Sequence, residues 1–220
     1  MNATTRVGGR GSAGERLALR QVLAFRLHRQ QLASRAPAGT AVDVLAAMAG
    51  AQAQLESAAA VSLWARIEAL ERTAVAARLW TDRAVAKAAC MRRTLHLVPA
   101  RALAEFVRGT AGRAHKEVRW MRNKGVSERD LGRAVDAALD AMQRPLTRAE
   151  LAESVGAALG LAPGWQAGGG WGSTRDVPSV RIGPVDTPAH YLLHLVSASG
   201  VVCYGPPRGN QPTFVRADAW

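Results

Sequence analysis

The chain has 220 residues, with 29 Lys+Arg against 17 Asp+Glu, a formal net charge of +12 and two cysteines. No stretch approaches the roughly 18 consecutive apolar residues of a membrane span, so we expect no membrane partner. Residues 1–14 are rich in Gly, Arg and Ser and lack the apolar segment of a secretory signal. Because Cys90 and Cys203 lie far apart, we expect reduced thiols in a cytoplasmic protein, without a disulfide framework.

The positive charge is concentrated in the first part of the chain. Residues 1–125 hold 21 of the 29 basic side chains and 8 of the 17 acidic ones, whereas residues 126–220 hold 8 and 9. Only three of the basic residues are Lys, and such an Arg excess often reflects genome composition. A one-sided basic excess is typical of a protein that binds a polyanion, with nucleic acid the first expectation and an acidic membrane surface the second.

Helical periodicity dominates the sequence after a basic tail, residues 1–14, that we expect to be disordered. Apolar spacing predicts helices over residues 15–32, 57–70 and 74–89, and another helix capped by Thr40. Thr94–Val98 alternates apolar and polar residues before Pro99, which predicts a short strand. Three or four helices followed by a strand are the outline of a winged helix, and we assign residues 15–125 to a first such module.

A basic amphipathic helix is predicted over residues 101–124. Its apolar residues, Leu103 and Met121 among them, fall on one half of the helical wheel. The other half is cationic: Arg101, Arg108, Lys116, Arg119 and Arg122. Such a face is either simply solvated or follows a phosphate backbone, and the pattern favours neither interpretation.

Residues 126–220 predict a second winged-helix module. We expect helices over residues 127–142, from Thr147 to about Gly160, and from Thr187 to Gly200. Thr147 and Glu150 have the spacing of a capping box. Residues 164–173 read as a loop, and residues 201–204 and 213–216 as the strands of a hairpin. The predicted fold class is therefore mainly α with small β-hairpins (α+β), arranged as tandem winged-helix modules.

Most catalytic and cofactor motifs are absent from the sequence. His190 and His194 lie four residues apart but lack the Glu of a zincin motif, so we expect no metal. The glycines at 168–170 lack the flanking strand and helix of a phosphate-binding loop. No serine-nucleophile signature occurs. We therefore expect no cofactor.

A glutamine pair, Gln52-Ala53-Gln54, stands out in the string from Ala49 to Ala58. Taken alone, the pair is best interpreted as helix-capping or solvated residues before a helix capped by Ser57. For the two amides to point together, we expect the backbone to turn at this point, between Gly50 and Ser57.

Several ordered segments together resemble the winged-helix DNA glycosylases of the AlkZ/YcaQ type. The similarity covers about residues 17–220, and its motifs are Gln52–Gln54, Leu63–Arg66, Met91–Leu97, Cys203–Pro206, Gly209–Val215 and Trp220. The resemblance implies tandem winged helices around a concave DNA-binding channel, and excision of N-alkylated purines, crosslinked ones included. It also implies that Gln52 and Gln54 are the catalytic motif.

The DNA contacts expected from this resemblance are Arg92, Arg93, His96, Arg119, Arg122 and Arg208. Arg92, Arg93 and His96 would lie near the first wing, and Arg208 at the hairpin tip could contact a groove or a phosphate. Simple exposure remains an alternative for the arginines, and a core or edge-strand role is favoured for His96. Trp64, Trp80 and Trp120 lie on helical stripes, so we expect them in the core.

The expected protein is thus a monomeric, nucleoid-associated DNA glycosylase acting on double-stranded DNA that is alkylated or crosslinked. Two alternatives stay open: a non-catalytic winged-helix DNA-binding protein such as a regulator, and a protein-interaction module. The family usually has Gly at the position of Arg93 and an aromatic residue at Ala88-Ala89. Family members also continue well beyond Trp220, so we expect a C-terminally truncated member.

Overall fold

The computed structural model describes residues 17–91, 94–109, 115–162, 164–166, 177–197 and 200–220. The helices are α1 (Leu19–Arg29), α2 (Ala41–Ala47), α3 (Glu56–Trp64), α4 (Ala74–Trp80), the 3₁₀ helix η2 (Ala100–Ala102), α5 (Leu103–Arg108), α6 (His115–Asn123), α7 (Glu128–Ala141), α8 (Arg148–Leu159) and α9 (Ala189–Ser197). The strands are β1 (Ala51–Gln52), β2 (Val85–Ala89), β3 (Leu95–Pro99), β4 (Gly164–Gln166), β5 (Val177–Ile182), β6 (Val185–Pro188), β7 (Val202–Arg208) and β8 (Gln211–Arg216). The fold is therefore α+β, as expected. Its description as tandem winged helices stays a prediction.

A small antiparallel sheet organises the first half of the chain. Its strand order is β1-β3-β2. Leu97 of the central strand β3 pairs with Ala51 of β1 on one side and with Lys87 of β2 on the other. These residues share one face of the sheet, and that face packs against α2, α3 and α4. The opposite face carries Ala86 and Val98 and packs against α5 and the hairpin β7–β8.

The second half has its own core, built from α6 to α9 and the sheet β4-β5-β6. Fully buried Leu151, Val155 and Leu192 lie at the centre of this core. Ser127 caps α7 by accepting the Asp130 backbone N–H at 3.1 Å, as its sequence position predicts. Gly160 ends α8 in the left-handed conformation, with φ +72°, again as expected.

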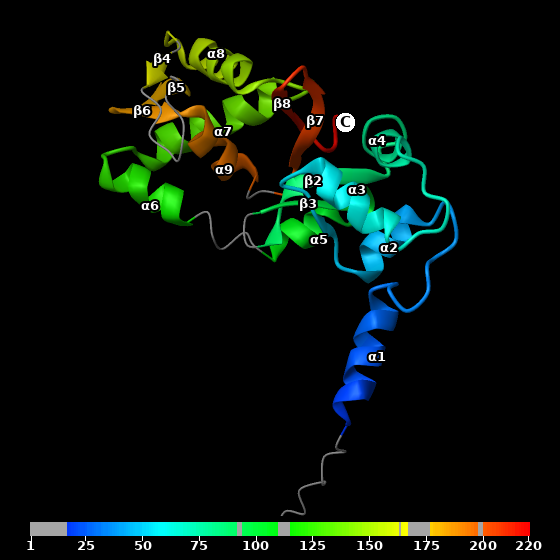
Figure 1. The fold of residues 1–220 in the computed structure, drawn as a ribbon. Coiled ribbons are helices and arrows are strands. Elements are labelled where there is room, and N and C mark those ends of the chain that lie inside the picture. Colours follow the sequence, from blue (N-terminus) through cyan, green and yellow to red (C-terminus); the bar gives the residue numbers. More distant parts are fainter. Residues whose placement is uncertain (1–16, 92–93, 110–114, 163, 167–176, 198–199) are drawn as a thin grey trace, which may run out of the picture.

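The hairpin β7–β8 lies between the two halves (Figure 1). Cys203 and Val215 face the core of the first half, whereas Phe214 packs into the core of the second. Leu146 and Phe214 also exchange backbone hydrogen bonds of 2.9 and 2.8 Å, which attach the hairpin to the start of α8. The predicted hairpin β7–β8 thus packs against both cores.

Several predicted boundaries are wrong. The helix expected over residues 74–89 ends at Trp80, and residues 85–89 form the strand β2. The single helix predicted over residues 101–124 is also wrong: α5 ends at Arg108 and packs into the first half, whereas α6 spans His115–Asn123 and packs into the second. Thr187 and Pro188, predicted to open the last helix, belong to the strand β6, and α9 begins at Ala189. Residues 164–166 are a strand, and the rest of that predicted loop to residue 173 lies outside the described residues.

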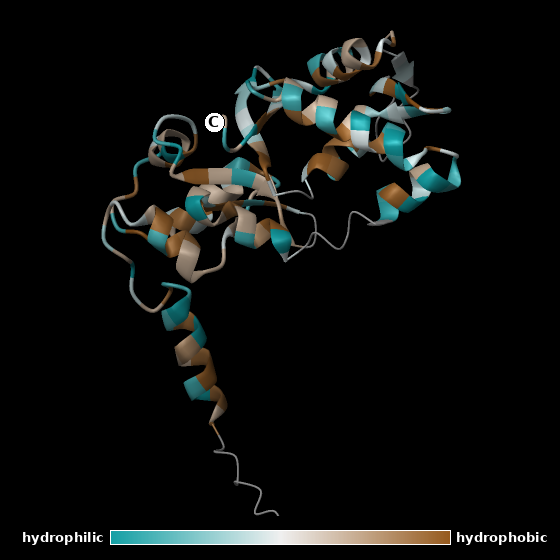
Figure 2. Ribbon diagram, turned by 180° about the vertical axis from the view of Figure 1, so that it is seen from behind, coloured by the Kyte–Doolittle hydropathy of each residue, from teal (hydrophilic) through white to brown (hydrophobic). Residues whose placement is uncertain are grey.

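The helix α1 forms as predicted but contributes nothing to a core. Every residue of α1 is at least partly exposed, including Leu19 at 72% and Phe25 at 65%. Figure 1 shows α1 extending away from the rest of the chain, and Figure 2 shows its hydrophobic positions uncovered. None of the described helices has the length and apolarity that crossing a membrane requires.

Candidate active site

The glutamine motif is preceded by a glycine, Gly50, that no other residue could replace without strain. Gly50 has φ +86°, and its N–H donates to the carbonyl of Leu45 near the end of α2. A Cβ at this position would lie 3.0 Å from the Leu97 carbonyl oxygen and 3.0 Å from Cγ1 of Val98. Gly50 therefore lets the chain turn out of α2 and run directly alongside β3.

Gln52 and Gln54 are exposed on either side of a buried residue. Gln52 ends β1, and Gln54 lies two residues further on, before α3. Ala51 and Ala53 are buried, with 2% and 0% of their surface exposed, whereas both glutamines are exposed. The chain bends at Gln54 and Leu55, inside the interval from Gly50 to Ser57 where a turn was predicted.

The glutamines are not helix caps. Helix α3 begins at Glu56, and its N-cap position is Leu55, which has no side-chain cap. Ser57 lies inside the helix, so its predicted capping role is also wrong. Instead, Oε1 of Gln54 accepts the backbone N–H of Leu95 at 2.6 Å. The amide of Gln54 thus terminates the β1–β3 pairing and is held at the sheet edge.

His96 lies directly across from the motif on β3. Its Cα pairs with that of Gln52 on one side and with that of Ala88 on the other. The side chain is only 5% exposed, and Nδ1 lies 2.9 Å from the Thr94 carbonyl oxygen. Directly paired residues share a sheet face. Gln52 and His96 therefore occupy the face that, further along the strands, packs against α5 and the hairpin.

The predicted arginine contacts that the structure describes, Arg119, Arg122 and Arg208, all lie on elements that contribute to the second core. Arg92 and Arg93 lie outside the described residues. Arg119 and Arg122 are exposed on α6, whose buried Met121 belongs to the second core, and Arg122 forms an ion pair with Glu128.

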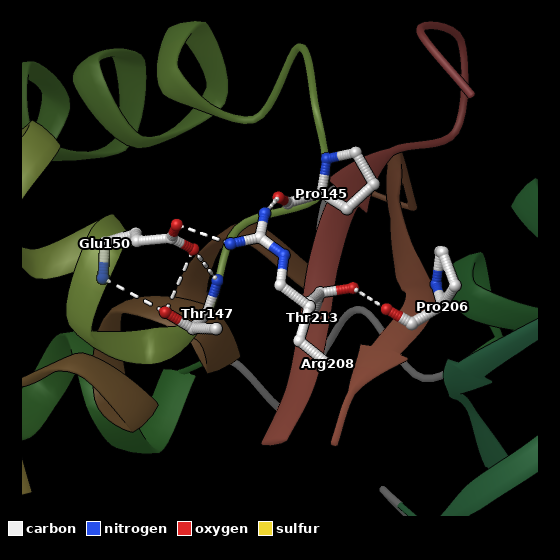
Figure 3. A network of polar contacts seen from close by, with 6 residues as sticks. All are labelled: Pro145, Thr147, Glu150, Pro206, Arg208 and Thr213. Atoms are coloured by element: carbon white, nitrogen blue, oxygen red, sulfur yellow. Dashed lines mark hydrogen bonds and ion pairs between the residues drawn. The ribbon is translucent and has the colours of Figure 1, made fainter. Parts of the chain in front are cut away.

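Arg208 lies at the end of β7 and folds back onto the start of α8 (Figure 3). Its guanidinium donates to Oε1 of Glu150 and to the Pro145 carbonyl. Glu150 also completes the predicted capping box, since Thr147 N–H donates to its carboxylate at 2.7 Å. The Thr147 backbone N–H, assisted by Arg208, lowers the pKa of Glu150 from its ordinary value. Arg208 is thus a structural partner of α8 as well as a predicted DNA contact.

A salt bridge and a cavity lie near the motif, and neither was predicted from the sequence. Nζ of Lys87 lies 3.3 Å from Oε2 of Glu56, two residues after Gln54. A cavity of about 510 Å³ opens between α3 and α4, with Glu56 and Trp64 in its wall but neither glutamine.

Trp64 is 57% exposed, so its predicted place in the core is wrong. The Arg35 guanidinium carbon lies 4.8 Å from the centroid of its ring.

Neither metal binding nor thiol chemistry is supported by the described residues. Within the described ranges, no group of three His, Cys, Asp or Glu side chains is placed to hold a metal ion. Cys90 and Cys203 are free and buried, and burial raises the pKa of each thiol to about 11. Both cysteines therefore remain protonated at neutral pH and serve as small core residues.

Comparison with known proteins identifies relatives over nearly the whole described chain. The family model for AlkZ-like DNA glycosylases matches residues 45–220. An interstrand DNA cross-link repair glycosylase of Streptomyces sahachiroi is 30% identical over 200 residues, covering 89% of this chain and 48% of the relative. The solved structure of the Streptomyces sahachiroi DNA glycosylase AlkZ superposes with a TM-score of 0.69 at 26% identity, over 93% of this chain and 51% of that one. The chain spans about half the length of these relatives, and it belongs to the AlkZ-like DNA glycosylase family.

Proposed function

We propose that this protein is a monofunctional DNA glycosylase that hydrolyses the N-glycosidic bond of N-alkylated purines in duplex DNA, with Gln52 and Gln54 as its catalytic residues. The observation that carries the proposal is the placement of two exposed glutamines on either side of buried Ala53, where β1 pairs with β3 and the Gln54 amide bonds the β3 backbone. Membership of a family of DNA glycosylases supports the reaction class. The name of one relative, a cross-link repair glycosylase, extends the substrate class to crosslinked purines.

The chemistry of the substrate explains why two neutral side chains suffice. Alkylation at N7 or N3 makes a purine cationic, so it departs as a neutral base and needs little acid assistance. The sugar then develops oxocarbenium-like positive charge at C1′. What the enzyme must supply is a water held in line with that carbon, together with dipoles that favour the developing charge.

Glutamine side chains can supply this without acting as bases. A primary amide both donates and accepts hydrogen bonds and carries no charge. Gln54 is held by its bond to Leu95, and Gln52 lies beside the buried His96. The two amides can therefore hold one water between them while the strand fixes their backbone.

DNA binding completes the proposal. We infer that the two halves act as tandem winged helices that hold the duplex against the glutamine face, as a monomer in the cytoplasm. Phosphate contacts are assigned to Arg92, Arg93, Arg119, Arg122 and Arg208, and the net charge of +12 favours a polyanionic ligand. Arg208 would reach phosphate only by exchanging its bond to Glu150.

The test is release of N7-methylguanine from a duplex under single-turnover conditions. Wild-type chain should release the base, and Gln52→Ala and Gln54→Ala should each lower the rate, on the order of a hundredfold, as loss of an oriented dipole does elsewhere. A matched control is Gln143→Ala, an exposed glutamine after α7, which should leave the rate unchanged.

Binding of the same duplex, measured by fluorescence anisotropy, separates catalysis from affinity. We expect both active-site variants to bind within about threefold of wild type, because phosphate contacts dominate affinity. Binding without base release by the wild-type chain would contradict the proposal and leave a non-catalytic DNA-binding protein. Loss of activity in Gln143→Ala would show that the effect of the other variants is not specific.

A further inference from the structure

We propose that His96 is a positioning residue that sets the orientation of the Gln52 amide, an inference that rests on the proposed glycosylase function. A primary amide has one end that accepts hydrogen bonds and one that donates them. A glutamine can direct a water only when a neighbour decides which end faces the substrate. Two catalytic amides therefore need two orienting partners.

The partner of Gln54 is the backbone of β3. Its Oε1 accepts the Leu95 N–H at 2.6 Å. The carbonyl end of this amide is thus committed to the sheet, and the NH₂ end is the one left for the site. Gln54 therefore acts toward a water as a hydrogen-bond donor.

The Thr94 carbonyl determines which nitrogen of the His96 ring carries the hydrogen. Nδ1 lies 2.9 Å from the Thr94 carbonyl oxygen, and a carbonyl oxygen can only accept, so Nδ1 carries the hydrogen. In the neutral ring Nε2 then has a free lone pair and accepts hydrogen bonds. A side chain only 5% exposed holds this acceptor at a fixed place on the sheet face.

Gln52 is close enough to use that acceptor. The neighbouring pair, Ala53 and Leu95, makes a backbone hydrogen bond of 2.7 Å, so Gln52 and His96 form the intervening non-hydrogen-bonded pair. The Cα atoms of such a pair lie roughly 4.5 Å apart, and their side chains approach more closely than in a hydrogen-bonded pair. In the proposed arrangement the Gln52 NH₂ group donates to Nε2 of His96, which leaves its Oε1 facing outward.

The two amides then present opposite ends to the same water. The water donates one hydrogen to Oε1 of Gln52 and accepts one from the NH₂ of Gln54. Its remaining lone pair is free to approach C1′ of the sugar.

Few charged groups lie on the elements packed against β3. The described ones are Lys87 on β2, Asp43 on α2, and Glu105 and Arg108 on α5. Lys87 pairs with Leu97, so it lies on the sheet face opposite His96 and bonds Glu56 there. Asp43 lies on α2, which packs on that opposite face, and is within 3.8 Å of Arg101. Glu105 and Arg108 are exposed on α5, on the His96 side of the sheet.

Two substitutions separate positioning from a purely structural role. His96→Asn keeps a donor for the Thr94 carbonyl but has no acceptor at the Nε2 position. His96→Gln places a carbonyl oxygen near that position. We expect base release by His96→Asn to fall roughly tenfold or more, and His96→Gln to recover most of that loss.

A readout that needs no activity keeps the inference separate from the proposed function. In ¹H–¹⁵N spectra of the whole chain, the Gln52 NH₂ signals are assigned by their loss in Gln52→Ala. These signals should move in His96→Asn, which removes the acceptor, and return toward their wild-type positions in His96→Gln. Gln52 signals that are the same in all three proteins, or rescue by Asn rather than Gln, would overturn the inference. Absence of base release from wild type would contradict the proposed function instead, and the Gln52 signals would still decide the role of His96.

Discussion

Gly50 is the residue on which the placement of the glutamine motif depends most. It combines φ +86° with a separation of only 3.0 Å between an added Cβ and the β3 backbone, whereas Gly39 has φ +85° and open space around it. Gly39→Ala should therefore lower the free energy of unfolding by about 1–2 kcal/mol, the cost of the left-handed backbone conformation alone. Gly50→Ala should cost about 1–3 kcal/mol more, because β1 must move away from β3. Urea unfolding of both variants measures the difference, and equal losses would contradict this account of Gly50.

The backbone bond of Gln54 gives this glutamine a part in stability. Oε1 of Gln54 accepts the Leu95 N–H at 2.6 Å. Gln54→Ala should therefore lower the free energy of unfolding by about 0.5–1.5 kcal/mol, the net value of one hydrogen bond. The exposed control Gln143→Ala should stay within about 0.5 kcal/mol of wild type. Urea unfolding measures both variants, and equal losses in the two would contradict a structural role for the Gln54 amide.

The capping box at Thr147 and Glu150 makes stability depend on pH. Because the pKa of Glu150 is lowered in the folded state, its contribution is present above the pKa of an unfolded glutamate and is lost as pH falls through the folded value. The stability difference between wild type and Glu150→Gln should therefore shrink between roughly pH 6 and roughly pH 3. Thr147→Ala should cost about 1 kcal/mol at neutral pH. A difference that stays constant across this range in urea unfolding would contradict the assignment.

At the scale of whole elements, α1 and α3 are the clearest contrast. Leu27 on α1 is 47% exposed, whereas Leu63 on α3 is 1% exposed in the first core. Leu63→Ala should cost about 2–5 kcal/mol, since it removes core contacts and leaves a cavity. Leu27→Ala should change stability by less than about 0.5 kcal/mol. Thermal unfolding of the two variants tests this, and a large loss in Leu27→Ala would show that α1 is packed in solution.

Sequence patterns predicted the elements whose signals are local. The Thr147 capping box, the Ser127 cap and the Gly160 stop are each set by residues within one helical turn, and all three are confirmed. The strand β3 and the hairpin β7–β8 are also confirmed, because alternating or β-prone residues flank clear turn residues.

Strands held by distant contacts could not be predicted in the same way. β2 consists of Val85, Lys87 and three alanines, a composition that favours a helix. It is a strand because β3 supplies its hydrogen bonds and cores lie on both of its faces. Thr187 and Pro188 resemble the start of a helix, but they belong to β6, which pairs with β5 around the turn at Gly183, where φ is +56°.

The same limit applies to the candidate site. The resemblance drew attention to Gln52 and Gln54, but the pairing of Gln52 with His96 and the bond of Gln54 to Leu95 depend on contacts more than 40 residues apart in the sequence. The local pattern suggested a helix cap at the motif, and tertiary pairing with β3 overrides it. Trp64 likewise lies on an apolar helical stripe, yet no described core covers it.

For the molecule as a whole, the hairpin β7–β8 connects the glutamine face to the second core. Val215 packs on the same sheet face that carries Gln52, while Phe214 anchors the hairpin to the start of α8. In the proposed function, this arrangement lets one half of the chain hold the catalytic amides while both halves grip the duplex.

The most direct test of this account is the single-turnover rate of N7-methylguanine release at saturating protein, compared between wild type and the double variant Gln52→Ala/Gln54→Ala at equal DNA occupancy. The account predicts release by wild type and a rate in the double variant that approaches the spontaneous depurination of the same duplex. Equal release by both proteins would contradict it.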